Sequence, residues 1–71
     1  MNSTAVLSPA DYELRFDSIF VEGRGLVFPC DERGHVDLDR LSERARNNYL
    51  YARAVVGREY LTPAVRPSAH H

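Results

Sequence analysis

The pattern of hydrophobic and polar positions is clearest between residues 37 and 57, where it predicts one long amphipathic helix. Apolar residues recur there every three or four positions, as one side of a helix requires. They are Leu38, Leu41, Ala45, Tyr49, Ala52 and Val56. Asp37 suits the N-cap position, and Gly57 suits the left-handed position that follows a helix. We therefore expect a helix over residues 38–56.

Residues 11–22 alternate between apolar and polar side chains, which is typical of a half-buried strand. The apolar face consists of Tyr12, Leu14, Phe16, Ile19 and Val21. The spacing along this face changes after Phe16, and one extra residue near Asp17 and Ser18 would restore it. We therefore predict a β-bulge at residues 17–18.

A second strand is expected over residues 25–30, after a tight turn in which Gly23 or Gly25 supplies a positive φ. With a two-residue loop, Val21 would face Leu26 and Ile19 would face Phe28. Leu26, Phe28 and Cys30 would then share the apolar face of the first strand. Because Pro29 has no amide proton, this strand should lie at an edge of the sheet.

The segment 58–62 is short, aromatic and β-branched, and Pro63 stops it, so we predict a third strand there. Together these elements predict a small α+β domain with the order ββαβ, in which the helix packs on one face of the hairpin. The folded domain should span residues 10–63, between flexible tails at 1–9 and 64–71. The final His70 and His71 are either native residues or the remains of a tag.

Composition narrows the classes of function. The 71 residues carry a net charge of −1, so the chain as a whole does not have the basic character of a nucleic-acid-binding domain. All nine basic residues other than histidine are arginine. This is explained either by the coding bias of a GC-rich genome or by selection for planar, bidentate donors.

A single cysteine excludes an internal disulfide and favours the reducing cytoplasm. We expect neither a signal peptide nor a membrane-spanning segment.

Three groups of residues are candidates for chemistry. Cys30 and His35 could form a thiolate–imidazole pair, but a second sulfur ligand for zinc is missing. The carboxylates around the second turn lack the ligand order of a calcium loop. They are Asp31, Glu32, Asp37 and Asp39. The Gly-Arg-Gly run at 23–25 lacks the further residues of a phosphate-binding loop. We therefore predict a protein that is not an enzyme and uses no metal or cofactor.

The polar side of the predicted helix is the best candidate for a functional surface. Leu50 and Ala54 point away from the apolar stripe, and a helix that is apolar on two sides needs a second cover. The candidate interaction residues are Arg40, Arg44, Asn47, Leu50, Tyr51 and Ala54. The favoured function is a protein-interaction or regulatory module, either as a homodimer or with another protein. The alternatives are nucleic-acid binding through the helix arginines and an ordinary solvated helix face.

Three segments of the sequence resemble a group of short uncharacterised bacterial proteins. They are residues 28–31 (Phe-Pro-Cys-Asp), residues 34–37 (Gly-His-Val-Asp) and residues 41–53. The resemblance covers roughly residues 12–62 and implies a bacterial, cytoplasmic protein. It implies no activity, ligand or site residue.

Overall fold

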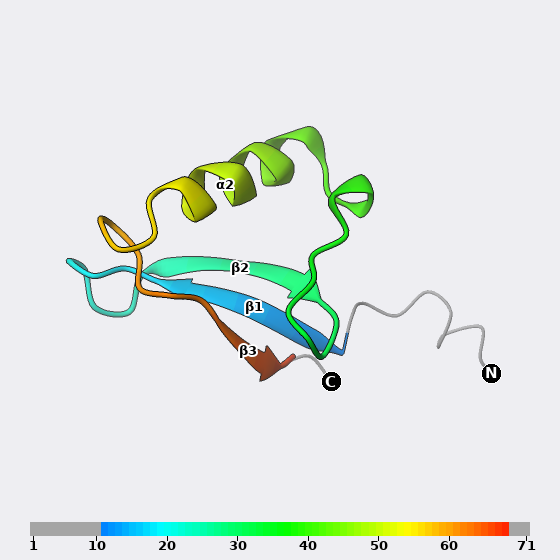
Figure 1. The fold of residues 1–71 in the computed structure, drawn as a ribbon, viewed down its shortest axis with the longest axis horizontal. Coiled ribbons are helices and arrows are strands. Elements are labelled where there is room, and N and C mark those ends of the chain that lie inside the picture. The colour runs from blue at the N-terminus through cyan, green and yellow to red at the C-terminus, as the bar shows by residue number, and fades with distance from the viewer. Residues whose placement is uncertain (1–10, 69–71) are drawn as a thin grey trace.

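The computed structural model describes residues 11–68, which form a three-stranded antiparallel sheet with one helix packed on it (Figure 1). The elements are β1 (Tyr12–Asp17), β2 (Gly25–Cys30), the 3-10 helix η1 (Leu38–Arg40), α2 (Glu43–Ala54) and β3 (Ala64–Pro67). This arrangement confirms the predicted small α+β domain of ββαβ order. The predicted N-terminal tail and the two terminal histidines lie outside the described residues.

The β1–β2 hairpin has the predicted alternation but a different register. Leu14 pairs with Phe28, and Phe16 pairs with Leu26. The buried members of the two strands are Leu14, Phe16, Phe28 and Cys30. However, β1 ends at Asp17, so the prediction that the strand runs to residue 22 and pairs Val21 with Leu26 was wrong.

The segment between β1 and β2 is a longer loop, and it replaces the β-bulge that we predicted at residues 17–18. The hydroxyl oxygen of Ser18 accepts hydrogen bonds from the amides of Phe20, at 3.2 Å, and Val21, at 3.0 Å. This local bonding competes with continuation of the strand. Ile19 and Val21 are consequently 40% and 47% exposed instead of joining the core. Gly23 supplies the positive φ, as predicted.

The α-helix begins later than the sequence predicted. Asp37 does act as a cap, but it caps only η1. Leu41 then adopts an extended conformation, with φ −87° and ψ 148°, which interrupts the helical path. Ser42 starts α2, because its side chain accepts a hydrogen bond of 3.1 Å from the amide of Ala45. The predicted helix 38–56 is therefore a 3-10 helix followed by a 12-residue α-helix.

The C-terminal end of the helix agrees more closely with the sequence. α2 ends at Ala54, and Gly57 has the predicted left-handed backbone, with φ +87°. The predicted apolar stripe does face the sheet. Its members that pack with the core are Leu41, Tyr49, Ala52 and Val56.

The third strand lies in a different place from the one predicted. β3 pairs with β1 in antiparallel orientation and gives the strand order β2-β1-β3. Residues 57–59 instead form a turn, which the hydrogen bond from the Gly57 amide to the Tyr60 carbonyl closes at 2.7 Å. The prediction of a strand at 58–62 was therefore wrong. The domain also extends beyond residue 63 into the predicted C-terminal tail.

Both edges of the sheet carry a proline. β2 is an edge strand, as Pro29 predicted. The other edge strand is β3. The Ser68 amide donates a hydrogen bond to the carbonyl of Asp11, which precedes β1. In an antiparallel pair only every second residue bonds to the partner strand, so the backbone groups of Val65 and Pro67 point away from β1. Because proline cannot donate a hydrogen bond, both edges are poor templates for an added strand.

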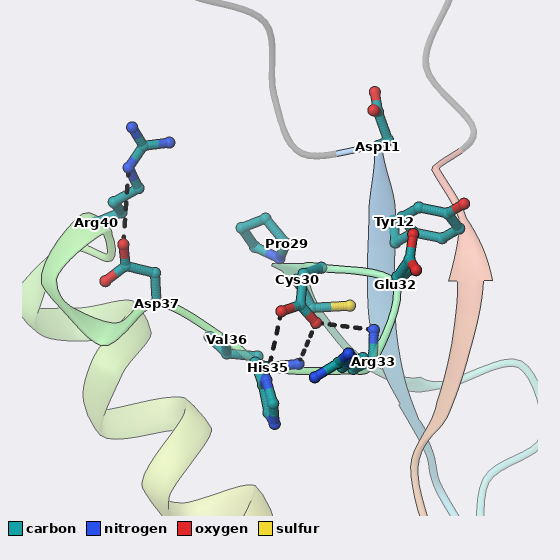
Figure 2. Close-up of a pocket in the computed structure, with 11 residues that line it drawn as sticks. Asp11, Tyr12, Pro29, Cys30, Glu32, Arg33, His35, Val36, Asp37 and Arg40 are labelled. Carbon is teal, nitrogen blue, oxygen red and sulfur yellow. Dashed lines mark hydrogen bonds and ion pairs between the residues drawn. The ribbon is translucent and has the colours of Figure 1, made fainter.

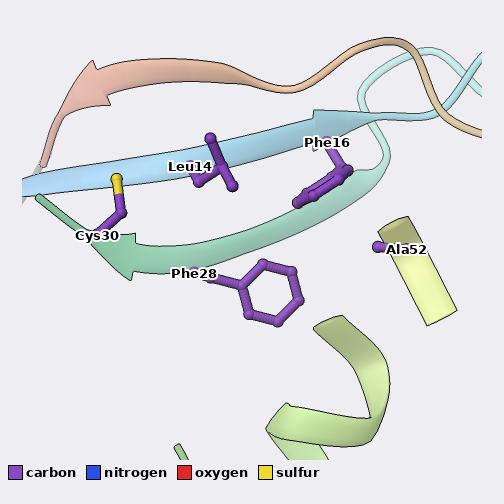
Figure 3. Close-up of a cluster of buried hydrophobic side chains, with 5 residues drawn as sticks. All are labelled: Leu14, Phe16, Phe28, Cys30 and Ala52. Carbon is purple, nitrogen blue, oxygen red and sulfur yellow. The ribbon is translucent and has the colours of Figure 1, made fainter. Parts of the chain in front are cut away.

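The core is small and centred on one aromatic ring. Its buried members are Leu14, Phe16, Phe28, Cys30 and Ala52. Figure 3 shows four of them on the two strands, with Ala52 approaching from α2. The ring of Phe16 makes edge-to-face contacts with Phe28, Tyr49 and Tyr60 at centroid distances of 5.8, 6.2 and 6.3 Å. Aromatic packing through Tyr49 therefore helps to attach the helix to the sheet.

Replacing Gly34 by alanine should destabilise the domain more than the same change at Gly23. Both glycines have a positive φ, of +88° and +84°, so both changes carry the left-handed penalty of about 1–2 kcal/mol. A Cβ atom at Gly34 would also lie 3.0 Å from Cγ2 of Val65, whereas one at Gly23 meets no atom within 4 Å. We expect an extra loss of about 0.5–1 kcal/mol at Gly34 in urea denaturation.

A second substitution tests the origin of that extra loss. Val65→Ala should remove it when combined with Gly34→Ala, because the close atom is then absent. Equal losses at the two glycines would mean that β3 does not hold Val65 against the loop.

Candidate functional site

The outer face of α2 presents the apolar patch that the sequence predicted. Leu50 and Tyr51 are 51% and 47% exposed, although both are large hydrophobic residues. Arg44, Asn47 and Ala54 are also exposed on this helix. We refer to these five residues as the outer α2 patch. The structure thus brings together five of the six predicted interaction residues.

Arg40 is separated from this group. It belongs to η1 instead of the long helix that we expected, because the extended Leu41 intervenes. Its Nε atom lies 3.8 Å from Oδ2 of Asp37, so its charge has a carboxylate partner. Arg40 therefore does not continue a row of arginines along α2.

The charge around the outer α2 patch is mixed. The side chain of Glu59 interacts with the Tyr51 hydroxyl, and this interaction is the main reason why the pKa of Tyr51 is raised. On another side of the helix, the guanidinium of Arg53 lies 5.9 Å from the ring centroid of Tyr49. A carboxylate thus accompanies Arg40 at one end and Tyr51 at the other, which interrupts the basic strip that a nucleic-acid surface would need.

An open groove of about 1150 Å³ lies away from the outer α2 patch, between β1, β2 and the loop before α2 (Figure 2). Cys30 and His35 both line it. Cys30 is only 4% exposed, and its burial, followed by the charges of Asp31 and Glu13, raises the pKa of its thiol. This shift is opposite to the one that activates a cysteine nucleophile. His35 contacts Asp31, with 3.4 Å between Nδ1 and Oδ2.

Asp31 organises the loop beside this groove. Its Oδ1 atom accepts hydrogen bonds of 2.8 Å from the amides of Arg33 and His35, both drawn as dashed lines in Figure 2. The bond from His35 is the main cause of the lowered pKa of Asp31. Within residues 11–68, no three histidine, cysteine or carboxylate side chains are grouped closely enough to hold a metal ion. The role of Asp31 visible in the structure is to shape the loop.

A second cavity, which sequence reasoning missed, lies between the end of α2 and β3. Its volume is about 580 Å³, and Arg33, Arg53 and Val65 are among its lining residues. These residues are far apart in the sequence, and Val65 falls in the segment that we had predicted as a tail. No local pattern could have indicated this site before β3 was located.

Comparison with known proteins adds no relative: no protein-family model matches the chain, and no curated protein or solved structure matches it. The resemblance to short bacterial proteins therefore stays a prediction. In the part of the chain that the structure describes, no helix has the length and apolar character needed to cross a membrane.

Proposed function

We propose that this protein is a non-enzymatic protein-interaction module that acts through the outer α2 patch, and that its partner is a second copy of the same chain. The observation that carries the proposal is the pair Leu50 and Tyr51, about half exposed in the middle of the only α-helix of residues 11–68. Aromatic and aliphatic side chains bordered by arginine are typical of interface centres.

The size of the core supports a need for further burial. Only five hydrophobic residues are buried in the described chain, and its lone cysteine forms no disulfide. Small domains with so little core commonly gain stability by association. The outer α2 patch would supply additional apolar area without changing the packing of α2 on the sheet.

Two alternatives have less support. Strand addition is disfavoured because Pro29 and Pro67 occupy the two sheet edges. Nucleic-acid binding is disfavoured because Arg40 is paired with Asp37 and Tyr51 with Glu59. A helix-to-helix contact is the mode that the exposed residues favour.

A two-fold contact centred on Leu50 is sterically simple. If two α2 helices cross in antiparallel orientation at this residue, Leu50 packs against its own copy. Ala54 of each chain then lies near Asn47 of the other, and the small alanine side chain leaves room for close approach. Arg44 would remain at the rim of the contact, where water solvates its charge.

Substitution of Leu50 by arginine should separate the two copies. The change places two desolvated charges at the centre of the contact, so we expect the dissociation constant to rise at least about 100-fold. Sedimentation velocity over a wide range of protein concentration measures this constant. The melting temperature should fall as well, because dimer formation stabilises the folded chain by mass action.

Val27→Arg is the matched control for this experiment. Val27 is 46% exposed, close to the value for Leu50, but it lies on β2 instead of α2. This variant should dimerise like the unmodified chain. A well-folded monomer at the highest concentration, unaffected by Leu50→Arg, would contradict the homodimer and leave a different protein as the partner.

A further inference from the structure

The cavity between α2 and β3 has the composition of a small-molecule site. We call it the α2–β3 cavity. It is an open hollow of about 580 Å³, large enough for a small ligand. Its lining includes three apolar residues, Leu14, Val56 and Val65, and three basic residues, Arg33, His35 and Arg53. No aspartate or glutamate is among the described residues that line it.

The cavity exists because the helix covers only part of the sheet. The core draws its residues from β1, β2 and α2, whereas all four residues of β3 are exposed. Val65 pairs with the buried Leu14 and is 37% exposed, so it extends the apolar face of the sheet beyond the edge of the core. This uncovered end of the apolar face is the floor of the cavity.

The backbone that carries two of the basic residues is held by local hydrogen bonds. The loop that carries Arg33 and His35 is fixed because Asp31 accepts hydrogen bonds from both of their amides. The same loop lies close to the floor, since a Cβ atom at Gly34 would be 3.0 Å from Val65. On α2, the contact of the Arg53 guanidinium with the Tyr49 ring restrains the Arg53 side chain. Such positioning reduces the entropy lost when a ligand binds.

The guanidinium groups of Arg33 and Arg53 have no carboxylate partner in the described chain. The ion pairs within residues 11–68 join Arg15 to Asp17, His35 to Asp31, and Arg40 to Asp37. Arg33 and Arg53 take part in none of them. Two planar guanidinium groups above an apolar floor are complementary to a carboxylate on an apolar body.

We infer that the α2–β3 cavity binds a small organic carboxylate, with its charged group between Arg33 and Arg53 and its apolar body on Val56 and Val65. This inference is independent of the proposed dimer, because the outer α2 patch does not line the cavity. A ligand bound in this cavity would contact β3 close to where β3 pairs with β1.

Titration of the full chain with hexanoate tests this site. Amide proton–nitrogen correlation spectra, recorded at low salt in a buffer without carboxylates or phosphate, should show saturable shifts at Gly34 and Val65. For a ligand of this size we expect a dissociation constant on the order of 1 mM. Added sodium chloride should weaken binding, because the contact is ionic and partly exposed. Hexanol and hexylammonium are the neutral and cationic controls, and both should bind at least about tenfold more weakly.

Variants of the two arginines separate charge recognition from simple apolar adsorption. Arg33 is in an exposed turn. Its replacement by glutamine should raise the dissociation constant for hexanoate about tenfold. Arg53→Gln should have a similar effect, and its amide spectrum shows whether the loss of the Tyr49 contact disturbs the fold. Arg24→Gln removes an exposed arginine that lies outside both the cavity and the outer α2 patch, and it should leave the constant unchanged.

Four results would overturn the inference. The first is equal binding of hexanol and hexanoate, and the second is binding that Arg33→Gln does not weaken. The third is a set of hexanoate shifts that does not saturate or that maps away from Gly34 and Val65. The fourth is binding of inorganic phosphate that is as tight as the binding of hexanoate, because the apolar floor would then contribute nothing to affinity.

Discussion

Replacement of Phe16 by alanine is expected to remove most of the stability of the folded domain. Phe16 is fully buried, and its ring contacts Phe28, Tyr49 and Tyr60. Truncating a buried phenylalanine costs about 3–5 kcal/mol. A domain of this length is stable by only about 3–9 kcal/mol, so the loss is comparable with the total. Circular dichroism with urea denaturation measures the outcome.

Phe20→Ala is the control for the same chemical change. Phe20 is 75% exposed, so its truncation should alter the free energy of unfolding by less than about 0.5 kcal/mol. Phe16→Leu keeps most of the volume and should cost about 1–2 kcal/mol, which gives a value that can be measured if the alanine variant does not fold. Similar losses for Phe16→Ala and Phe20→Ala would contradict the packing of α2 on β1.

Replacement of Ala52 by aspartate should be the most damaging change within α2. Ala52 is completely buried where the helix meets the sheet. No buried residue of the described chain is polar or charged, so a carboxylate there would have no buried partner. We expect a loss of at least about 3 kcal/mol at neutral pH. Asn48→Asp, which adds the same charge one turn earlier at an exposed position, should cost less than about 0.5 kcal/mol.

The pH dependence of the Ala52→Asp loss supplies a second check. Burial would raise the pKa of the new carboxyl above its unfolded value of about 3.9. The loss relative to the unmodified chain is then smallest below that pH, where the carboxyl is neutral in both states. It grows as the pH rises, because only the unfolded chain ionises freely. A loss that is constant between acidic and neutral pH would indicate that residue 52 reaches solvent.

The sequence predicted the faces of its elements better than their boundaries. The alternation at Tyr12, Leu14 and Phe16 placed these side chains on the inner face of β1, and the helical spacing identified Tyr49 and Ala52 as residues that pack on the sheet. Both patterns depend only on the periodicity of a strand or a helix. The outer α2 patch follows from the same periodicity, so its exposed residues could also be named in advance.

Element ends were less predictable because they depend on competing local interactions. The hydroxyl of Ser18 captures two amides and ends β1, although apolar residues follow it. Ser42 caps α2 five residues after the Asp37 cap that we had assigned to one continuous helix. In each case a side-chain hydrogen bond outweighs the apolar pattern. Both serines were visible in the sequence, but the pattern alone did not show which cap would define the main helix.

By itself, then, the sequence determined that this chain forms a β-hairpin covered by one amphipathic helix, because local periodicity decides which side of each element is apolar. Only the tertiary structure decided where the third strand lies. Residues 64–67 have little strand character of their own, and they become β3 because the free edge of β1 offers backbone partners. The α2–β3 cavity is decided at the same step. Arg33, Arg53 and Val65 all line it, and the pairing of β3 with β1 is what adds Val65 to the other two.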